Sequence, residues 1–95
     1  MLVLPAELTH VQARTCLNML LETARAEKDP LALVDASALA RFDSSALAVL
    51  LACRRECLHD SRQFAVHGLP PRLRELATLY GVAELLPDHA AGAAA

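Results

Sequence analysis

The chain changes from a polar turn to an unbroken apolar run within the stretch Ala40-Arg41-Phe42-Asp43-Ser44-Ser45-Ala46-Leu47-Ala48-Val49-Leu50-Leu51-Ala52-Cys53. The apolar part, residues 46–53, contains helix formers and neither Gly nor Pro, so it predicts a helix rather than a strand. Asp43 or Ser44 is suited to cap the start of this helix. The positive end of a helix can also hold a phosphate or another anion, although most helices use Asp and Ser there simply as caps.

Length and composition indicate one domain with an ordinary apolar core. Ninety-five residues can bury such a core without disulfides or metal, and three cysteines, an odd number, argue against a disulfide framework. The net charge of −2 and the lack of a basic run argue against nucleic-acid binding. No apolar stretch approaches the ~20 residues of a membrane span. The N-terminus lacks the features of a signal peptide, so we expect a cytoplasmic protein.

Strand-like and helix-like segments alternate along the chain. Short apolar runs bounded by turn residues predict strands at residues 2–4, 31–34 and 64–66, with 31–34 as a fully buried central strand. Helices are predicted from Thr9 to about residue 27, from residues 43–44 to about 59, and from Pro71 to a stop at Gly81. This order is typical of βαβ crossovers and a mainly parallel sheet.

Further expectations concern the buried positions and the end of the chain. Leu50 lies in the middle of the apolar run and is expected to be fully buried. The last helix should bury the stripe Leu73, Leu76, Ala77 and Tyr80. After one more short turn, residues 1–87 should complete the domain, and residues 88–95 should form a disordered, Ala-rich tail.

Two motifs resemble the signature of the STAS domain family. Leu31-Ala32-Leu33-Val34-Asp35 precedes Phe42-Asp43-Ser44-Ser45-Ala46-Leu47, and the resemblance extends over almost the whole chain. The ending Leu79-Tyr80 followed by Leu86-Pro87 is most similar to the MlaB-type subunits of the phospholipid-asymmetry ABC transporter. The resemblance implies an α/β fold of STAS type, a small mixed sheet of three to four strands with helices packed on one side.

The family resemblance also implies a binding function rather than an enzyme. In anti-sigma factor antagonists a kinase phosphorylates the hydroxyl residue after the motif Asp, which corresponds to Ser44. In MlaB-type subunits the same position contacts the transporter ATPase. We therefore expect partner binding at Asp43, Ser44, Ser45, Ala46 and Leu47, with Ser44 a possible phosphoacceptor. The partner would be an ABC transporter ATPase at the inner membrane or, alternatively, an anti-sigma factor kinase, and no cofactor is expected.

The sequence departs from the family pattern at two points, and two groups of residues could suggest a metal site or a hydrolase. Ala46 stands where the family usually has Gly. The family's usual first strand, which would precede Leu2, is missing. Either a sheet edge is therefore uncovered or the assigned start of the sequence lies too far downstream. Cys53 and Cys57 with His59 lack the further ligands of a metal site and are interpreted as buried apolar residues. Ser44 has none of the flanking glycines of a hydrolase nucleophile.

Overall fold

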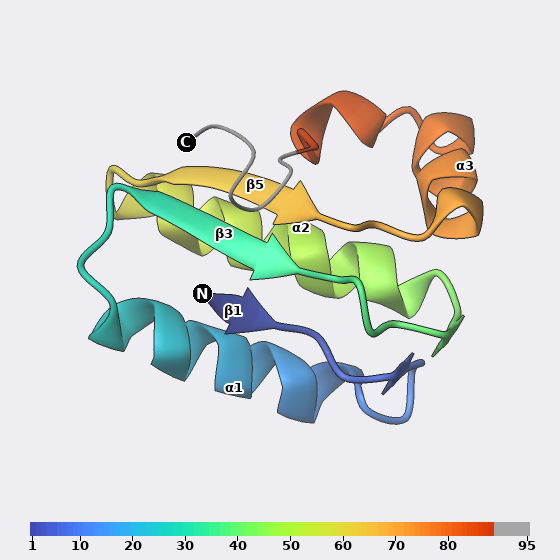
Figure 1. The fold of residues 1–95 in the computed structure, drawn as a ribbon, viewed down its shortest axis with the longest axis horizontal. Helices are drawn as coiled ribbons and strands as arrows, with labels where there is room; N and C mark the ends of the chain where they lie inside the picture. The colour runs from blue at the N-terminus through green and yellow to red at the C-terminus, as the bar shows by residue number, and fades with distance from the viewer. Residues whose placement is uncertain (89–95) are drawn as a thin grey trace.

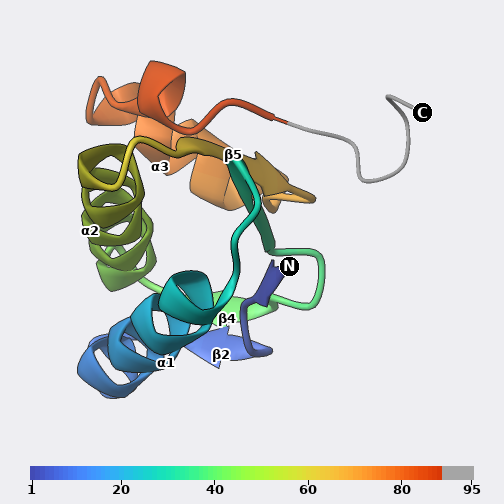
Figure 2. The same ribbon diagram turned by 90° about the vertical axis from the view of Figure 1, so that its left-hand side faces the viewer.

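Three parallel strands form the sheet of this protein, whose computed structural model describes residues 1–88. The strand order is β1 (Leu2–Val3), β3 (Leu31–Asp35) and β5 (Gln63–His67), so the strand expected at the centre lies there. Helices α1 (Ala13–Ala26) and α2 (Ser45–His59) cover one face of the sheet, and α3 (Pro71–Leu79) follows the carboxyl end of β5 (Figures 1 and 2). The expected α/β fold, a small sheet with helices packed on one side, is confirmed, and where a mixed sheet was expected all strand pairs among the described residues are parallel.

The core lies between the sheet and helices α1 and α2. Leu2, Val34 and Val66 are neighbours in register across the three strands, and all three are completely buried. Leu50 of α2 is also completely buried, as the apolar run predicted. The expectation that residues 31–34 are buried on both faces is wrong, because Leu31 and Leu33 on the opposite face are only half-buried. No helix covers that face in the part of the chain that the structure describes (Figure 2).

A second parallel pair, β2 (Glu7–Leu8) with β4 (Arg41–Phe42), was not predicted. It begins where the amides of Ala40 and Arg41 both donate to the carbonyl oxygen of Ala6, at 2.8 and 3.0 Å. Two-residue strands are too short to show an alternating pattern in sequence. Their pairing matters for function because it brings the segment after β2 beside the start of α2.

Helix α1 begins at Ala13, and the expected start at Thr9 is wrong. The side-chain oxygen of Gln12 accepts from both the amide and the hydroxyl of Thr9, each at 2.8 Å. Thr9 and Gln12 are spaced as in a capping box, where each side chain accepts the other residue's backbone amide. Only the bond to the Gln12 side chain forms, and the Thr9 hydroxyl oxygen accepts the Val11 amide at 3.3 Å instead. Residues 9–12 make a separate turn, closed by a bond from the Gln12 amide to the Thr9 carbonyl at 3.1 Å.

Gly81 ends the last helix as expected, with a positive φ of 74°. The amide of Gly81 donates to the Thr78 carbonyl, and the amide of Val82 donates to the Ala77 carbonyl at 2.8 Å, which is the Schellman arrangement. The expected burial of Tyr80 is wrong: Tyr80 follows the last helical residue and its side chain is 58% exposed. The chain has left the helical path at that point, so the buried stripe ends at Ala77, which is completely buried.

The chain returns to the sheet after a short 3-10 turn, η1 (Ala83–Leu85), where the sequence predicted one more turn. Leu86 is completely buried, and the Val66 amide donates to the Pro87 carbonyl at 2.9 Å. Asp88 forms a bridge with Val66 at the outer edge of β5. The rest of the tail that we expected to be disordered, residues 89–95, lies outside the described residues.

Gly68 closes the carboxyl end of the sheet between β3 and β5. Its φ is +70°, and an added Cβ would lie 2.9 Å from the Cβ of Ser37. The Ala36 amide donates to the His67 carbonyl at 2.8 Å, so the two segments after the strands are tied together here. A side chain at position 68 would force them apart.

Candidate functional site

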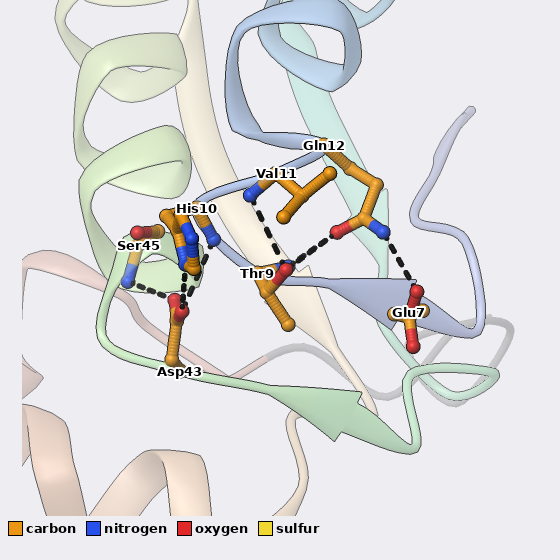
Figure 3. Close-up of polar contacts among 7 residues, drawn as sticks. All are labelled: Glu7, Thr9, His10, Val11, Gln12, Asp43 and Ser45. Carbon is orange, nitrogen blue, oxygen red and sulfur yellow. Dashed lines mark hydrogen bonds and ion pairs between the residues drawn. The ribbon is translucent and has the colours of Figure 1, made fainter.

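The carboxylate of Asp43 holds the start of α2. Its Oδ1 accepts the amide N–H of Ser45 at 2.8 Å (Figure 3). Ser44 makes no side-chain capping bond. Of the two capping residues that the sequence offered, Asp43 is thus the one whose side chain caps the helix. The next amides are also engaged, since Ala46 donates to the Asp43 carbonyl and Leu47 to the Ser44 carbonyl, both at 3.1 Å. The helix start therefore presents a carboxylate and bonded amides, which disfavours an anion site.

His10, from the turn before α1, contacts the other oxygen of Asp43. The His10 amide donates to Asp43 Oδ2 at 3.1 Å, and the imidazole Nδ1 lies 3.2 Å from the same oxygen (Figure 3). Donation by the His10 amide is the main cause that lowers the pKa of Asp43 from 3.8 to about 2, with a further contribution from the Ser45 amide. Asp43 is consequently a carboxylate at every physiological pH, and the turn carries a fixed negative charge.

No pattern in the sequence points to a contact of His10 with Asp43, because the two residues are 33 positions apart. The two residues meet because β2 and β4 pair, which places residues 9–10 beside residue 43. The adjoining network of Glu7, Thr9 and Gln12 fixes the same segment: Gln12 Nε2 donates to a Glu7 carboxylate oxygen at 2.7 Å while its Oε1 accepts from Thr9 (Figure 3). Residues 43–45, which we call the docking turn because partner binding is expected there, are therefore held from both sides.

The five residues expected to contact a partner differ in accessibility. Ser44 is exposed, and Asp43 and Ser45 are partly exposed. Ala46 and Leu47, by contrast, belong to the core, with exposed fractions of 0% and 3%. The surface that a partner can reach in this part of the chain is thus the docking turn, and the small side chain of Ala46 serves packing beneath it.

Shallow hollows adjoin the docking turn on the side of α3. One, of about 330 Å³, is lined by Phe42, Arg72, Glu75, Leu76 and Leu79. A second, of about 270 Å³, shares Phe42 and Arg72 with it and also includes Thr9 and Arg41. Leu79 is 77% exposed at its outer rim. This surface combines apolar side chains with Arg41, Arg72 and the acidic Glu75, and Phe42 connects it along the chain to Asp43.

Other reactive groups are buried or scattered. Cys16, Cys53 and Cys57 are free thiols in the core, and burial is the main cause that raises the pKa of Cys53 to about 12. Burial also raises the pKa of Cys16 and Cys57. Within residues 1–88 no group of three or more His, Cys, Asp or Glu side chains is arranged to hold a metal ion. None of the helices in that range combines the length and apolarity that crossing a membrane would require.

Comparisons with known proteins agree with the fold. Residues 1–87 match the family model described as "Mlab, STAS domain". A solved structure of an anti-sigma-factor antagonist (STAS) domain protein from Planctomyces limnophilus superposes with a TM-score of 0.77 at 19% sequence identity, covering 93% of this chain and 79% of that one. A search of curated proteins gave no match. Because the family model spans nearly all of the described residues, the chain belongs to the STAS domain family.

Proposed function

We propose that this protein is a non-enzymatic accessory subunit that binds and stabilises the cytoplasmic ATPase of a phospholipid-transport ABC transporter of Mla type. Such a transporter maintains the lipid asymmetry of the outer membrane, and the subunit would reach the inner face of the inner membrane through its partner. The observation that carries this proposal is the match of residues 1–87 to the family described as "Mlab, STAS domain".

The docking turn and the hollows beside it form the proposed contact surface. Ser44 offers an exposed, uncharged hydroxyl at the start of α2, and Leu79 offers an exposed apolar side chain at the far rim. Arg72 and Glu75 line the hollow on the side of Leu79, and the exposed Arg41 pairs with Glu7 at 3.4 Å. An exposed apolar side chain beside groups of both charges suits a partner that brings an apolar anchor with a polar rim around it.

The proposed mechanism is that binding of the subunit shifts the conformational equilibrium of the ATPase. A subunit that binds only the competent conformation of the ATPase raises the fraction of ATPase in that conformation, by an amount set by its concentration and its dissociation constant. No chemical step on the STAS domain is required. The free energy comes from the interface alone, so mutations in the docking turn should change binding without changing the fold of the free domain.

The substitution Ser44→Asp tests this surface. It places a second carboxylate beside that of Asp43, and burying the added charge against the partner should lower affinity more than ~10-fold. The fold should survive, because a negative charge is favourable in the first turn of a helix. Ser61→Asp is the matched control: Ser61 is exposed in the turn that follows the other end of α2. Arg72→Asp, at the edge of the hollows, should have a smaller effect than Ser44→Asp.

The measurement is the affinity for the ATPase captured from the membrane fraction, together with thermal melting of each free variant. A Ser44→Asp variant that melts like wild type and binds the ATPase as tightly as Ser61→Asp does would exclude the docking turn as the interface. Failure of wild-type protein to capture any ABC transporter ATPase would reject the transporter proposal itself.

A second candidate function is that of an anti-sigma factor antagonist regulated by phosphorylation of Ser44. The observation that favours it is the Ser44 hydroxyl, which is exposed and makes no capping bond, so it is free for a kinase. A phosphate on Ser44 would add up to two negative charges beside the permanently charged Asp43. Like-charge repulsion and the cost of desolvation would then release a partner that docks there.

Intact mass spectrometry of the protein from growing cells separates the two candidates. The transporter proposal expects no stoichiometric phosphate on Ser44. A substantial fraction that carries one added phosphate mapped to Ser44, and that loses it in a Ser44→Ala variant, would favour the signalling function instead.

A further inference from the structure

Helix α2 is apolar on every side over its first turns. The run from Ala46 to Cys53 contains no polar side chain, and it is longer than two helical turns, so apolar side chains point in all directions. The sheet and α1 bury the inner side of the run, including Leu50. Ala48 is nevertheless exposed, and Leu51 and Ala52 are only half-buried. Because a helix that is apolar all round usually has its whole surface covered, the outer side of α2 is suited to a further contact.

A shallow apolar groove of about 320 Å³ lies on this outer side, between α1 and α2. One wall consists of Ala48, Val49 and Ala52 of α2, and the other consists of Ala13, Arg14 and Leu17 of α1. The two helices lie side by side, and both have a side that is turned away from the sheet (Figure 2). A groove between two helices accepts the ridge of side chains of a third helix.

The groove begins at the docking turn. Ser44, Ala48 and Ala52 follow one another at intervals of four residues, so their side chains form one line along α2. Ser44 and Ala48 are both exposed. A partner that contacts the Ser44 hydroxyl is therefore brought directly over the groove.

Arg14 gives the groove its electrostatic character. Among the described residues that line the groove, Arg14 alone is charged. Its side chain is exposed, and within residues 1–88 its guanidinium takes part in no ion pair or hydrogen bond. An entirely apolar partner would cover this cation without pairing it. A partner with a carboxylate opposite Arg14 would form a charge-assisted hydrogen bond with it.

The same arginine argues against other surfaces that could cover the groove. A second copy of this chain, placed groove to groove about a two-fold axis, would bring another Arg14 and no carboxylate from the groove. A nucleic acid is held by several cations, whereas this groove has one. A lipid surface is entered by protruding large apolar side chains, which a hollow lined largely by alanines lacks. An acidic, amphipathic protein segment fits the groove better than any of these.

We propose that the groove between α1 and α2 binds an amphipathic helix of the partner ATPase, with apolar side chains against Leu17 and Ala48 and a carboxylate opposite Arg14. This inference rests on the proposed function and adds the element of the partner that is recognised. Recognition is of the helix-in-groove kind, in which apolar anchors recur at every third or fourth position of the bound helix. The docking turn determines where that helix begins its contact.

Affinity for the purified ATPase, once it has been captured from the membrane fraction, tests the proposal. Ala48→Glu should lower the affinity more than ~10-fold because it introduces a charge among buried apolar contacts, and Arg14→Glu should do so because it opposes two carboxylates. Both changes lie in the first turn of a helix, where a negative charge is favourable, so the free domain should melt like wild type. Arg25→Glu is the matched control: it makes the same reversal at an exposed position near the other end of α1, and the affinity should stay within about twofold.

Cross-linking identifies the segment that occupies the groove. Asn18 is exposed and lies one turn after Arg14 on α1, and the native thiols are buried. A benzophenone attached to an Asn18→Cys variant should therefore react from the rim of the groove alone. The cross-linked ATPase peptide should carry Asp or Glu and have apolar residues at helical spacing. A cross-linked peptide without an acidic residue would contradict the pairing with Arg14.

The remaining outcomes separate the groove from the docking turn. If Ser44→Asp weakened ATPase binding while Ala48→Glu and Arg14→Glu bound like wild type, the groove proposal would be overturned and the docking turn would stand. A wild-type dimer in sedimentation, or binding of wild type to anionic phospholipid vesicles, would overturn it equally if Ala48→Glu abolished that association. Failure of wild type to capture any ABC transporter ATPase would reject the proposed function and the groove proposal together.

Discussion

Truncation of Leu50 to alanine should destabilise the domain more than a change at any exposed position. Leu50 is completely buried in α2, and its neighbours Val49 and Cys53 are buried as well. Loss of the leucine side chain beyond Cβ removes about 2.5 kcal/mol of transfer free energy. Helix α1 and the sheet are regular elements that cannot collapse far into the space, so a residual cavity of about 50 Å³ adds roughly 1 kcal/mol.

The expected loss is therefore about 3–4 kcal/mol, out of a total unfolding free energy of roughly 5–15 kcal/mol. Urea titration followed by circular dichroism measures it, and the midpoint should fall by at least ~1 M. Leu79→Ala is the control, because it makes the same truncation at a side chain that is 77% exposed, and it should cost under ~0.5 kcal/mol. If Leu50→Ala lost less than ~1 kcal/mol, or no more than Leu79→Ala, the orientation of α2 described above would be refuted.

Three further predictions follow from particular groups. The pKa of Asp43 is lowered from 3.8 to about 2, so the stability that its charge provides is complete above about pH 4 and is lost as the pH falls toward 2. NMR of the Asp43 carboxyl group should give a titration midpoint near 2, and a midpoint near 3.8 would contradict the His10 contact. Cys53 is completely buried and burial raises its pKa to about 12, so Ellman's reagent should label this thiol only as fast as the protein unfolds, and rapid labelling of Cys53 in the native protein would contradict its burial. Gly68→Ala should destabilise the fold by ~1 kcal/mol or more beyond Gly81→Ala, since both have positive φ but only at Gly68 does an added Cβ meet a neighbour; equal urea midpoints would count against that close approach.

The sequence predicted the fold where an unbroken apolar run is bounded by turn residues. The run that contains Leu50 and the shorter run at residues 31–34 placed the second helix and the central strand correctly for this reason. Tyr80 was misplaced because a helical stripe was extended past the residue at which the chain turns. The start at Thr9 was misplaced because residues 9–12 form a separate turn, in which the Thr9 hydroxyl accepts from the Val11 amide and the Thr9 carbonyl accepts from the Gln12 amide, and the helix begins only after it.

The candidate site was predicted only in part, because some of its contacts join segments that are far apart in the sequence. Asp43 and Ser44 stand out because a helix start needs capping groups, and this need is visible in sequence. His10 does not stand out, because its contact with Asp43 depends on a pair of two-residue strands formed between distant segments. Ala46 and Leu47 were included in the expected surface although the first turn of α2 already directs them inward.

The contact between His10 and Asp43 affects the affinity and the association rate that the proposed partner would have. Backbone segments that are ordered only on binding lower affinity through the conformational entropy they lose, and here that loss has already occurred in the free protein. Association can then proceed as rigid docking, with an on-rate set by diffusion and orientation. A His10→Gly variant would loosen the loop that meets Asp43, so its effect should fall on partner affinity through entropy even though His10 need never touch the partner.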